Sequence, residues 1–133
     1  MNKILLDTNA YIRLLEGSYV INSFLVESEI IFFPSIAIGE LFAGFYGGTR
    51  LKENKEILEK FISRPSVQVS IIGTGTAEIY GEIKSELKKQ GTPIPINDIW
   101  IAACAIENGA KLVTYDKHFL NIQGLRLWEE IKK

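Results

Sequence analysis

The sequence is poor in several features that would assign a protein to a class at once. It has a single cysteine, Cys104, so no internal disulfide can form. This thiol lies within the apolar run 99–106, which is typical of a small core residue in a reducing compartment. The formal net charge of -1 provides no bulk attraction to nucleic acid. A plain nucleic-acid-binding module usually carries a clear basic excess, so this class is disfavoured.

Long apolar segments are also missing. No stretch approaches the roughly 20 residues that are needed to span a bilayer. The first apolar run, 4–6, is too short for a signal peptide and is interrupted by Asp7. We therefore expect a cytoplasmic protein with no membrane partner. Because 133 residues can bury a sizeable core, and 47% of them are hydrophobic, we expect one domain that covers residues 1–133.

Aspartate is scarce, and each aspartate lies beside an apolar segment, which is unusual for a residue that only makes the surface soluble. Among 16 acidic residues only three are aspartates, and all three lie at the edge of an apolar segment. Asp7 ends one apolar run, Asp98 opens another, and Asp116 closely follows a third. An acid that only makes a surface soluble has no reason to keep this position, so these three residues are candidates for a functional site.

Short apolar or alternating segments are separated by helical patterns along the chain. The helix expected at 36–46 has Ser35 as its N-cap. Strands that alternate with helices predict an α/β fold, in which a parallel sheet is covered on both faces. The strands that we expect are 3–6, 30–33, 67–71, 111–115 and 125–128.

The fold places the candidate acids near one another. In an open parallel sheet, ligands bind at the carboxyl ends of the strands. Asp7 and Asp116 follow two expected strands, and Asp98 begins a helix, whose positive end favours a carboxylate. Glu40 is a fourth candidate, because it lies one turn into an otherwise apolar helix, where an unpaired charge is costly. We expect the four carboxylates to converge.

Converging carboxylates repel one another unless a cation binds between them. Mg²⁺ prefers oxygen ligands, and Mn²⁺ accepts the same set. A metal ion of this kind polarises a phosphoryl oxygen and activates water, so the pattern favours metal-dependent hydrolysis of a phosphodiester. Nearby hydroxyl and amide groups would orient the carboxylates. The supporting residues that we expect are Thr8, Asn9, Asn97 and Thr114.

Each acid also has a purely structural interpretation. Asp7 can cap a helix, Asp98 can interact with a helix dipole, and Asp116 can start a turn. Glu40 can pair with an arginine such as Arg13. The same holds for their neighbours, since two of the expected supporting residues can equally be helix caps. These two residues are Thr8 and Asn9.

Four motifs extend over nearly the whole chain. They are Asp7-Thr8-Asn9, Glu40-Leu41, Asn97-Asp98-x-x-Ile101-Ala102-Ala103 and Leu112-Val113-Thr114-x-Asp116-x-x-Phe119. Together they resemble the PIN-domain ribonucleases, and most nearly the VapC-type toxins of toxin–antitoxin pairs. The resemblance implies a three-layer α/β/α sandwich with a central parallel sheet. It also implies an endoribonuclease, a hydrolase that depends on Mg²⁺ or Mn²⁺. The metal ligands and catalytic residues would be Asp7, Glu40, Asp98 and Asp116.

The resemblance also implies partners. Proteins of this kind form homodimers and are silenced by a cognate VapB-type antitoxin, which covers apolar helices and the acidic site. A set of apolar residues could supply that groove, or could equally be core or homodimer contacts. They are Phe42, Phe45, Tyr46, Leu51 and Leu58. The RNA substrate would be met by scattered cations, because there is no basic excess. These include Arg13, Arg50, Lys52 and Lys117.

Two other functions stay open. The first is a catalytically inactive PIN-like module that binds RNA or protein. The second is an aspartate-dependent phosphatase with Asp7 as its nucleophile, although such an enzyme would carry a second aspartate where this chain has Asn9. The single histidine, His118, could protonate a leaving oxygen. Its position in a turn nevertheless favours an ordinary surface residue.

Overall fold

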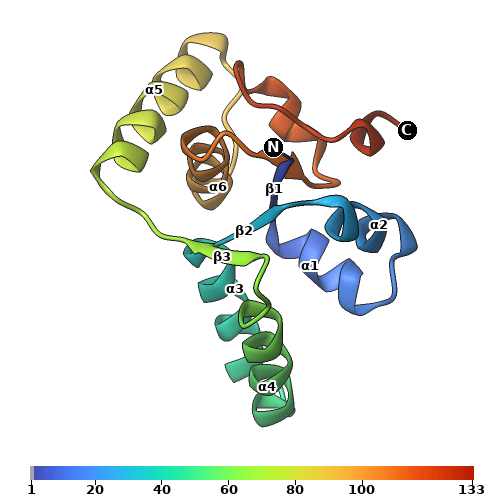
Figure 1. Ribbon diagram of the computed structural model, residues 1–133. Helices are drawn as coiled ribbons and strands as arrows, with labels where there is room; N and C mark the ends of the chain where they lie inside the picture. The colour runs from blue at the N-terminus through green and yellow to red at the C-terminus, as the bar shows by residue number, and fades with distance from the viewer. Residues whose placement is uncertain (1) are drawn as a thin grey trace.

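The centre of the fold is a four-stranded parallel sheet. A computed structural model describes residues 2–133, and in it the strand order is β3-β2-β1-β4 (Figure 1). Leu5 in the middle of β1 lies opposite Phe32 of β2 and Leu112 of β4. The α/β prediction with parallel strands is therefore confirmed. The strands are β1 (Lys3–Leu6), β2 (Ile30–Pro34), β3 (Val67–Ser70) and β4 (Lys111–Val113).

Both faces of the sheet are buried, because alternate residues of each strand belong to different hydrophobic cores. On β1, Ile4 and Leu6 pack in one core, and Leu5 packs in the other. Phe32 and Leu112, the neighbours of Leu5, join the same core as Leu5. Side chains of successive strand residues point to opposite faces, so this division produces three layers. The expected α/β/α sandwich is what the structure shows.

The helices cover the two faces unequally. Helices α5 (Thr74–Gln90) and α6 (Ile96–Glu107) pack against the face that contains Leu5. The core on the other face receives residues from α1 (Thr8–Leu15), α2 (Tyr19–Glu27), α3 (Ser35–Tyr46) and α4 (Leu51–Ile62). Figure 1 shows α3 and α4 side by side, as an arm that projects away from the sheet. No helix within residues 2–133 is long and apolar enough to cross a membrane. Two short 3₁₀ helices follow β4, namely η1 (Lys117–Asn121) and η2 (Glu129–Lys132).

Two local predictions are wrong. The segment 125–128 is not a fifth strand, because it meets β4 only at a single bridge between Leu112 and Leu127. The three residues of β4 offer little length for pairing, and the chain enters η2 directly after this bridge. Ser35 is not an N-cap, since α3 already begins at Ser35 and Pro34 occupies the cap position without a side-chain hydrogen bond.

Trp128 connects the last segment of the chain to the core. Its side chain is fully buried, and its ring packs edge-on against Phe24 and Tyr115, with centroids 5.2 Å apart in both pairs. Its indole N–H donates to the carbonyl of Thr114 at 2.6 Å. Because Thr114 directly follows β4, this contact holds the end of that strand in place.

We predict that Trp128→Phe lowers the free energy of unfolding by about 2–4 kcal/mol. The smaller ring leaves a cavity, and the buried carbonyl of Thr114 loses its donor. Urea unfolding followed by circular dichroism measures the effect. The matched control is Trp100→Phe, which alters a half-buried ring that stacks on Tyr80 and should cost about 1 kcal/mol or less. Equal losses in the two variants would contradict this role of Trp128.

Candidate active site

Asp7 and Thr114 join the ends of two neighbouring strands. Asp7 directly follows β1 and is 4% exposed. One of its carboxylate oxygens accepts a hydrogen bond from the backbone N–H of Ala10 at 2.8 Å, so Asp7 is the N-cap of α1. The other oxygen accepts from the hydroxyl of Thr114, and the same hydroxyl accepts from the backbone N–H of Asp116 at 3.0 Å. Asp7 therefore both caps a helix and lies at the predicted site.

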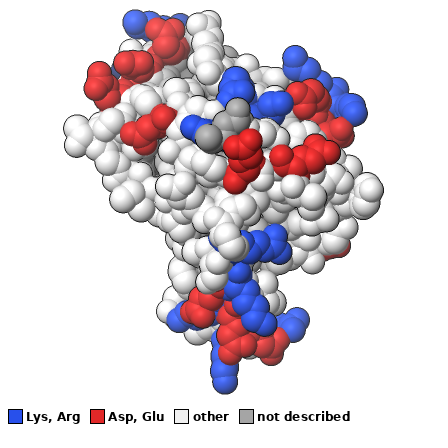
Figure 2. Space-filling view, in the orientation of Figure 1, with Lys and Arg blue, Asp and Glu red and all other residues white. Residues whose placement is uncertain are grey.

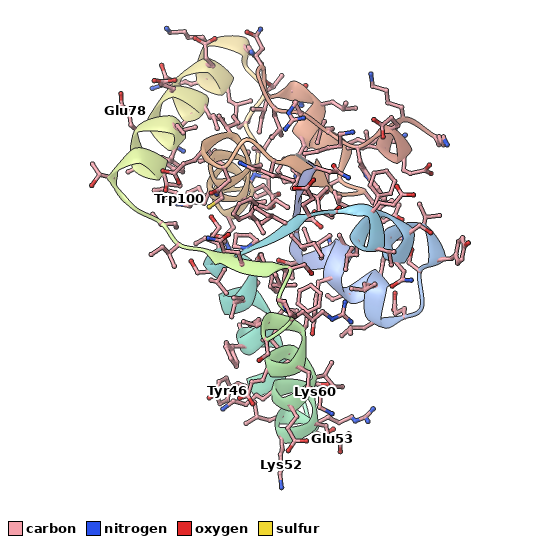
Figure 3. All side chains as sticks on the ribbon, viewed as in Figure 1. Tyr46, Lys52, Glu53, Lys60, Glu78 and Trp100 are labelled. Atoms are coloured by element: carbon pink, nitrogen blue, oxygen red, sulfur yellow. The ribbon has the colours of Figure 1, made fainter. Side chains whose placement is uncertain are left out.

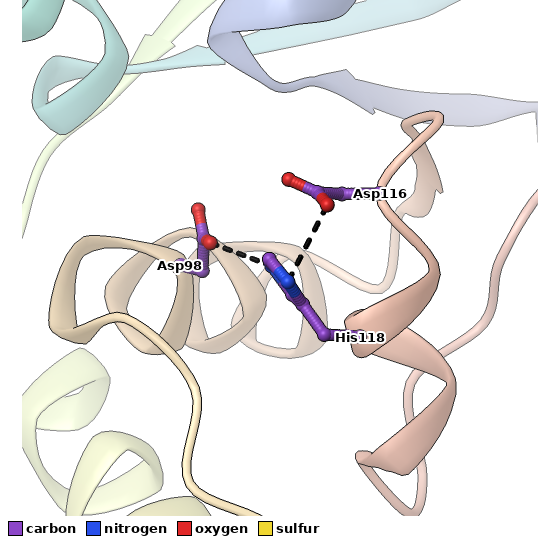
Figure 4. Close-up of side chains that lie close together, drawn as sticks. All are labelled: Asp98, Asp116 and His118. Atoms are coloured by element: carbon purple, nitrogen blue, oxygen red, sulfur yellow. Dashed lines mark hydrogen bonds and ion pairs between the residues drawn. The ribbon is translucent and has the colours of Figure 1, made fainter.

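Asp98 and Asp116 lie close together, with His118 between them (Figure 4). The imidazole Nε2 is 2.7 Å from Oδ2 of Asp98, and Nδ1 is 3.4 Å from Oδ1 of Asp116. One possible ligand atom from each residue lies within 4.8 Å of the other two. Asp98 is in the first turn of α6, and the other two residues flank the start of η1. Segments that are distant in sequence thus form one compact cluster.

The favoured interpretation of His118 as an ordinary surface residue is wrong. Its side chain is 28% exposed, and it contacts two candidate acids instead of pointing into solvent. The 3₁₀ turn of η1 folds the chain back directly after Asp116, and this brings the imidazole to the acids. The available signal in the sequence was that His118 lies two positions after Asp116, and it concerns only the contact between these two residues. A neutral imidazole has one N–H, so its second nitrogen can offer a lone pair.

Glu40 lies beside this cluster and is not part of its compact centre. It is exposed on α3, so the expectation that its charge is buried is wrong. The hydroxyl of Thr8 donates to one carboxylate oxygen at 2.6 Å, and the side-chain amide of Asn97 donates to the other at 3.5 Å. Glu40 does not pair with Arg13, whose guanidinium instead lies over the ring of Tyr115. The structure therefore places Glu40 at the rim of the site.

The expected supporting residues contact different acids of the site. Thr114 contacts Asp7, whereas Thr8 and Asn97 contact Glu40. Neither Thr8 nor Asn9 is a cap of α1, because Asp7 holds that position. Asn9 is exposed, and it lines a groove that also includes Asp116.

The acids influence one another electrostatically. Burial raises the pKa of Asp7 from 3.8 to about 6, against the hydrogen bonds from Thr114 and Ala10, and the charges of Asp98 and Asp116 add to the rise. Burial also raises the pKa of Asp98; His118 opposes this rise, and the charges of Asp116 and Glu40 increase it.

No Lys or Arg within residues 2–133 forms an ion pair with any of the four acids. Among the described residues, His118 is thus the only basic side chain that contacts these carboxylates, and a bound cation would balance their charge. The donors present are carboxylate oxygens and one imidazole nitrogen, and oxygen-rich sets of this kind suit Mg²⁺ and Mn²⁺. Burial is the main cause of the raised pKa of Asp7 and of Asp98, and a hard divalent cation near Asp98 and Asp116 would counter the smaller contribution from repulsion between the acids. On the chemistry of its donors, the arrangement fits such an ion.

The arm formed by α3 and α4 carries charges of both signs. On the face shown in Figure 2, Lys and Arg are interspersed with Asp and Glu along this arm. Figure 3 shows Tyr46 there with Lys52, Glu53 and Lys60, and the side chain of Tyr46 is 66% exposed. Leu58, in contrast, is buried in the core. All five apolar residues considered for a partner groove lie on this arm. Tyr46 is exposed enough to contact a partner, and Leu58 is not.

Comparison with known proteins assigns the fold to a family. The profile of the PIN domain matches residues 4–125. Ribonuclease VapC1 of Haemophilus influenzae strain R2866 is 31% identical over 134 residues, which cover 97% of this chain and 98% of the relative. The tRNA(fMet)-specific endonuclease VapC of Salmonella typhimurium strain LT2 is 31% identical over 130 residues and covers 96% and 97%.

A solved structure agrees with these relatives. In the complex of VapBC2 from Rickettsia felis with a DNA fragment from its promoter, the similar chain has a TM-score of 0.85 and 27% sequence identity. The similarity covers 95% of this chain and 97% of that one. Because the profile spans most of the sequence and the sheet order, helices and acid positions lie within it, this chain belongs to the PIN-domain family.

Proposed function

We propose that this chain is a metal-dependent endoribonuclease that hydrolyses RNA phosphodiester bonds as the toxin of a VapBC-type toxin–antitoxin pair. The observation that carries the proposal is the compact cluster of Asp98, Asp116 and His118, together with Asp7, which is close enough for the charges of both other aspartates to raise its pKa. The names of its relatives, ribonuclease VapC1 and tRNA(fMet)-specific endonuclease VapC, support RNA as the substrate. The site of action would be the cytoplasm.

The proposed metal site divides the work among the side chains. A divalent ion, Mg²⁺ or Mn²⁺, supplies the polarisation of a phosphoryl oxygen and a lower pKa for the attacking water. Asp98 and Asp116 would hold it most directly, since their oxygens are closest together. Asp7 and Glu40 would complete the set of acids. The polar residues that orient these carboxylates would be Thr114 at Asp7, and Thr8 and Asn97 at Glu40, with Asn9 beside Asp116.

The expected partners follow from the same family. Solved relatives are VapBC complexes, which supports a VapB-type antitoxin as the partner of this chain. Exposed apolar side chains on the first two helices offer a surface for such contacts or for a homodimer. They include Ile12, Leu15, Tyr19 and Val20.

The geometry disfavours a phosphatase in which Asp7 is the nucleophile. Both carboxylate oxygens of Asp7 already accept hydrogen bonds, from Ala10 and from Thr114. The side chain is also almost fully buried, so a phosphate ester has little access to it, whereas a small metal ion needs only a remaining lone pair on one oxygen. Asn9, where a second aspartate would stand, is exposed in the groove.

We predict that Asp98→Asn lowers the rate of RNA cleavage by more than about 100-fold. This is more than the loss typical of a residue that only hydrogen-bonds to a metal ligand. The substitution removes a charge from the compact cluster but preserves its shape. A gel assay with labelled RNA in Mg²⁺ or Mn²⁺ measures the rate, and a chelator should abolish cleavage by the unaltered chain. Glu78→Gln is the control, because Glu78 is an exposed acid on α5 (Figure 3) and its loss should leave the rate unchanged.

The same variant tests metal binding without an assay of activity. Saturating Mn²⁺ should raise the melting temperature of the unaltered chain and of Glu78→Gln, because a ligand that binds only the folded state stabilises it. Asp98→Asn should show a much smaller rise. A rise of equal size in all three proteins, or cleavage by Asp98→Asn at the full rate, would contradict the proposed site. An inactive binding module would instead show no cleavage in any variant.

The pKa of Asp7 predicts how stability depends on pH in the absence of metal. Because the folded-state pKa of about 6 lies above 3.8, the native state binds more protons between these values, and stability falls as pH rises through this window. Asp7→Asn removes that loss and keeps an oxygen acceptor for Ala10. The variant should therefore gain up to about 3 kcal/mol over the unaltered chain between pH 4 and pH 7.

Urea unfolding in the presence of a chelator, at several values of pH, measures this difference. Taking the variant minus the unaltered chain cancels the titration of other groups that both proteins share. Asp7→Asn should have no RNA-cleaving activity at any pH, so the substitution raises stability and lowers activity. A difference in stability that stays constant with pH would show that burial does not perturb Asp7.

A further inference from the structure

A polar groove extends from the candidate active site along α1. Asp116 belongs both to the acid cluster and to the wall of this groove, so the two are continuous. The other lining residues come from α1, from the residue that ends it and from the position before Asp116. They are Asn9, Ile12, Arg13, Glu16 and Tyr115.

Arg13 is held in this groove by an aromatic stack. Its guanidinium carbon lies 4.2 Å from the centroid of the Tyr115 ring. That ring packs edge-on against Trp128, and Trp128 in turn packs against Phe24. Because Trp128 is fully buried, the stack extends from the core to the surface and gives the guanidinium a rigid support. An arginine supported in this way loses little conformational freedom when it binds a ligand.

The charge of the groove indicates what Arg13 can bind. Arg13 is the only cation among the lining residues, and within residues 2–133 it forms no ion pair. Its planar fork of N–H donors matches a phosphate, and stacking on Tyr115 leaves the donor edges free. Glu16 and Asp116 repel an anion elsewhere in the groove. A phosphate is therefore attracted at one point, which would set the register of a bound strand.

Other cations that could meet RNA lack this arrangement. Arg50 pairs with Glu53 on α4, and Lys52 lies next to it on the arm. Lys117 is exposed in η1 and does not line the groove. The net charge of -1 means that one well-placed cation matters more than it would in a basic protein.

We propose that Arg13, supported by Tyr115, binds a backbone phosphate of single-stranded RNA adjacent to the bond that is cleaved. This inference rests on the proposed function, since it assigns a phosphate position to the same substrate. The segment 114–116 links the two parts, because Thr114 contacts Asp7, Tyr115 supports Arg13, and Asp116 belongs to the acid cluster. A strand bound at Arg13 would thus be aligned with the acids.

The experiment measures RNA binding separately from cleavage. In the Asp98→Asn background, fluorescence anisotropy follows a labelled single-stranded RNA of mixed sequence at several salt concentrations. Arg13→Gln should weaken binding by roughly tenfold, as expected for a charge-assisted contact. The slope of log affinity against log salt should also become shallower by about 0.7, the value for one phosphate contact on a single strand. Arg13→Lys should keep the slope, because it keeps the charge.

Arg64→Gln is the matched control. Arg64 is also an arginine over an aromatic ring, 5.3 Å from the centroid of Phe61, but it lies outside the groove. Its substitution should change neither the affinity nor the slope. Because Arg13 is exposed, melting temperatures should show that Arg13→Gln stays folded.

Three outcomes would overturn the inference. If the unaltered chain cleaves RNA but Arg13→Gln binds RNA as well as Arg64→Gln does, the phosphate position is wrong and the proposed function stands. If Arg13→Gln weakens binding of a poly-glutamate peptide and not of RNA, the groove takes an acidic protein. If the unaltered chain neither binds nor cleaves RNA, the proposed function fails, and the phosphate position fails with it.

Discussion

The site depends on one buried hydroxyl. Thr114 has no exposed surface, and its side chain donates to Asp7 while it accepts from the backbone of Asp116. Asp7 follows β1 and Thr114 follows β4, so this hydroxyl connects the ends of two adjacent parallel strands. The carbonyl of Thr114 is occupied as well, by the indole of Trp128. A position with this many contacts can hold carboxylates close together although their charges repel.

The arrangement of acids has a thermodynamic cost that the rest of the fold must offset. The raised pKa of Asp7 means that its charged form is less stable in the folded chain than in water. The two hydrophobic cores on opposite faces of the sheet supply the stability that tolerates it. In the proposed enzyme, a divalent cation would neutralise this charge, so that stability and activity would have the same requirement.

The alternation of strands and helices was readable from the sequence, because each strand is a short apolar run between turn residues. The position of the aspartates at the ends of these runs was equally readable, since it depends only on local order. The environment of Glu40 was not, because hydrophobicity along α3 does not reveal which side faces solvent. The contact of His118 with Asp98 also depends on a 3₁₀ turn that brings residues 20 positions apart together, and no local pattern reports that contact. The weak pairing of 125–128 likewise depends on the length of its neighbour, β4.

The proposed reaction must bring one anion to another, and the distribution of charge suggests how the chain permits it. Four acids and a net charge of -1 repel an RNA backbone at the place where cleavage would occur. A bound cation reverses the local sign, and Arg13 would add an attraction a short distance along the same groove. A bound metal ion would therefore increase the affinity for RNA, and bound RNA would increase the affinity for the metal ion. By linkage, whatever factor the metal contributes to RNA affinity, RNA contributes equally to metal affinity. A chain without a basic surface would in this way bind RNA strongly only when the site is ready to cleave it.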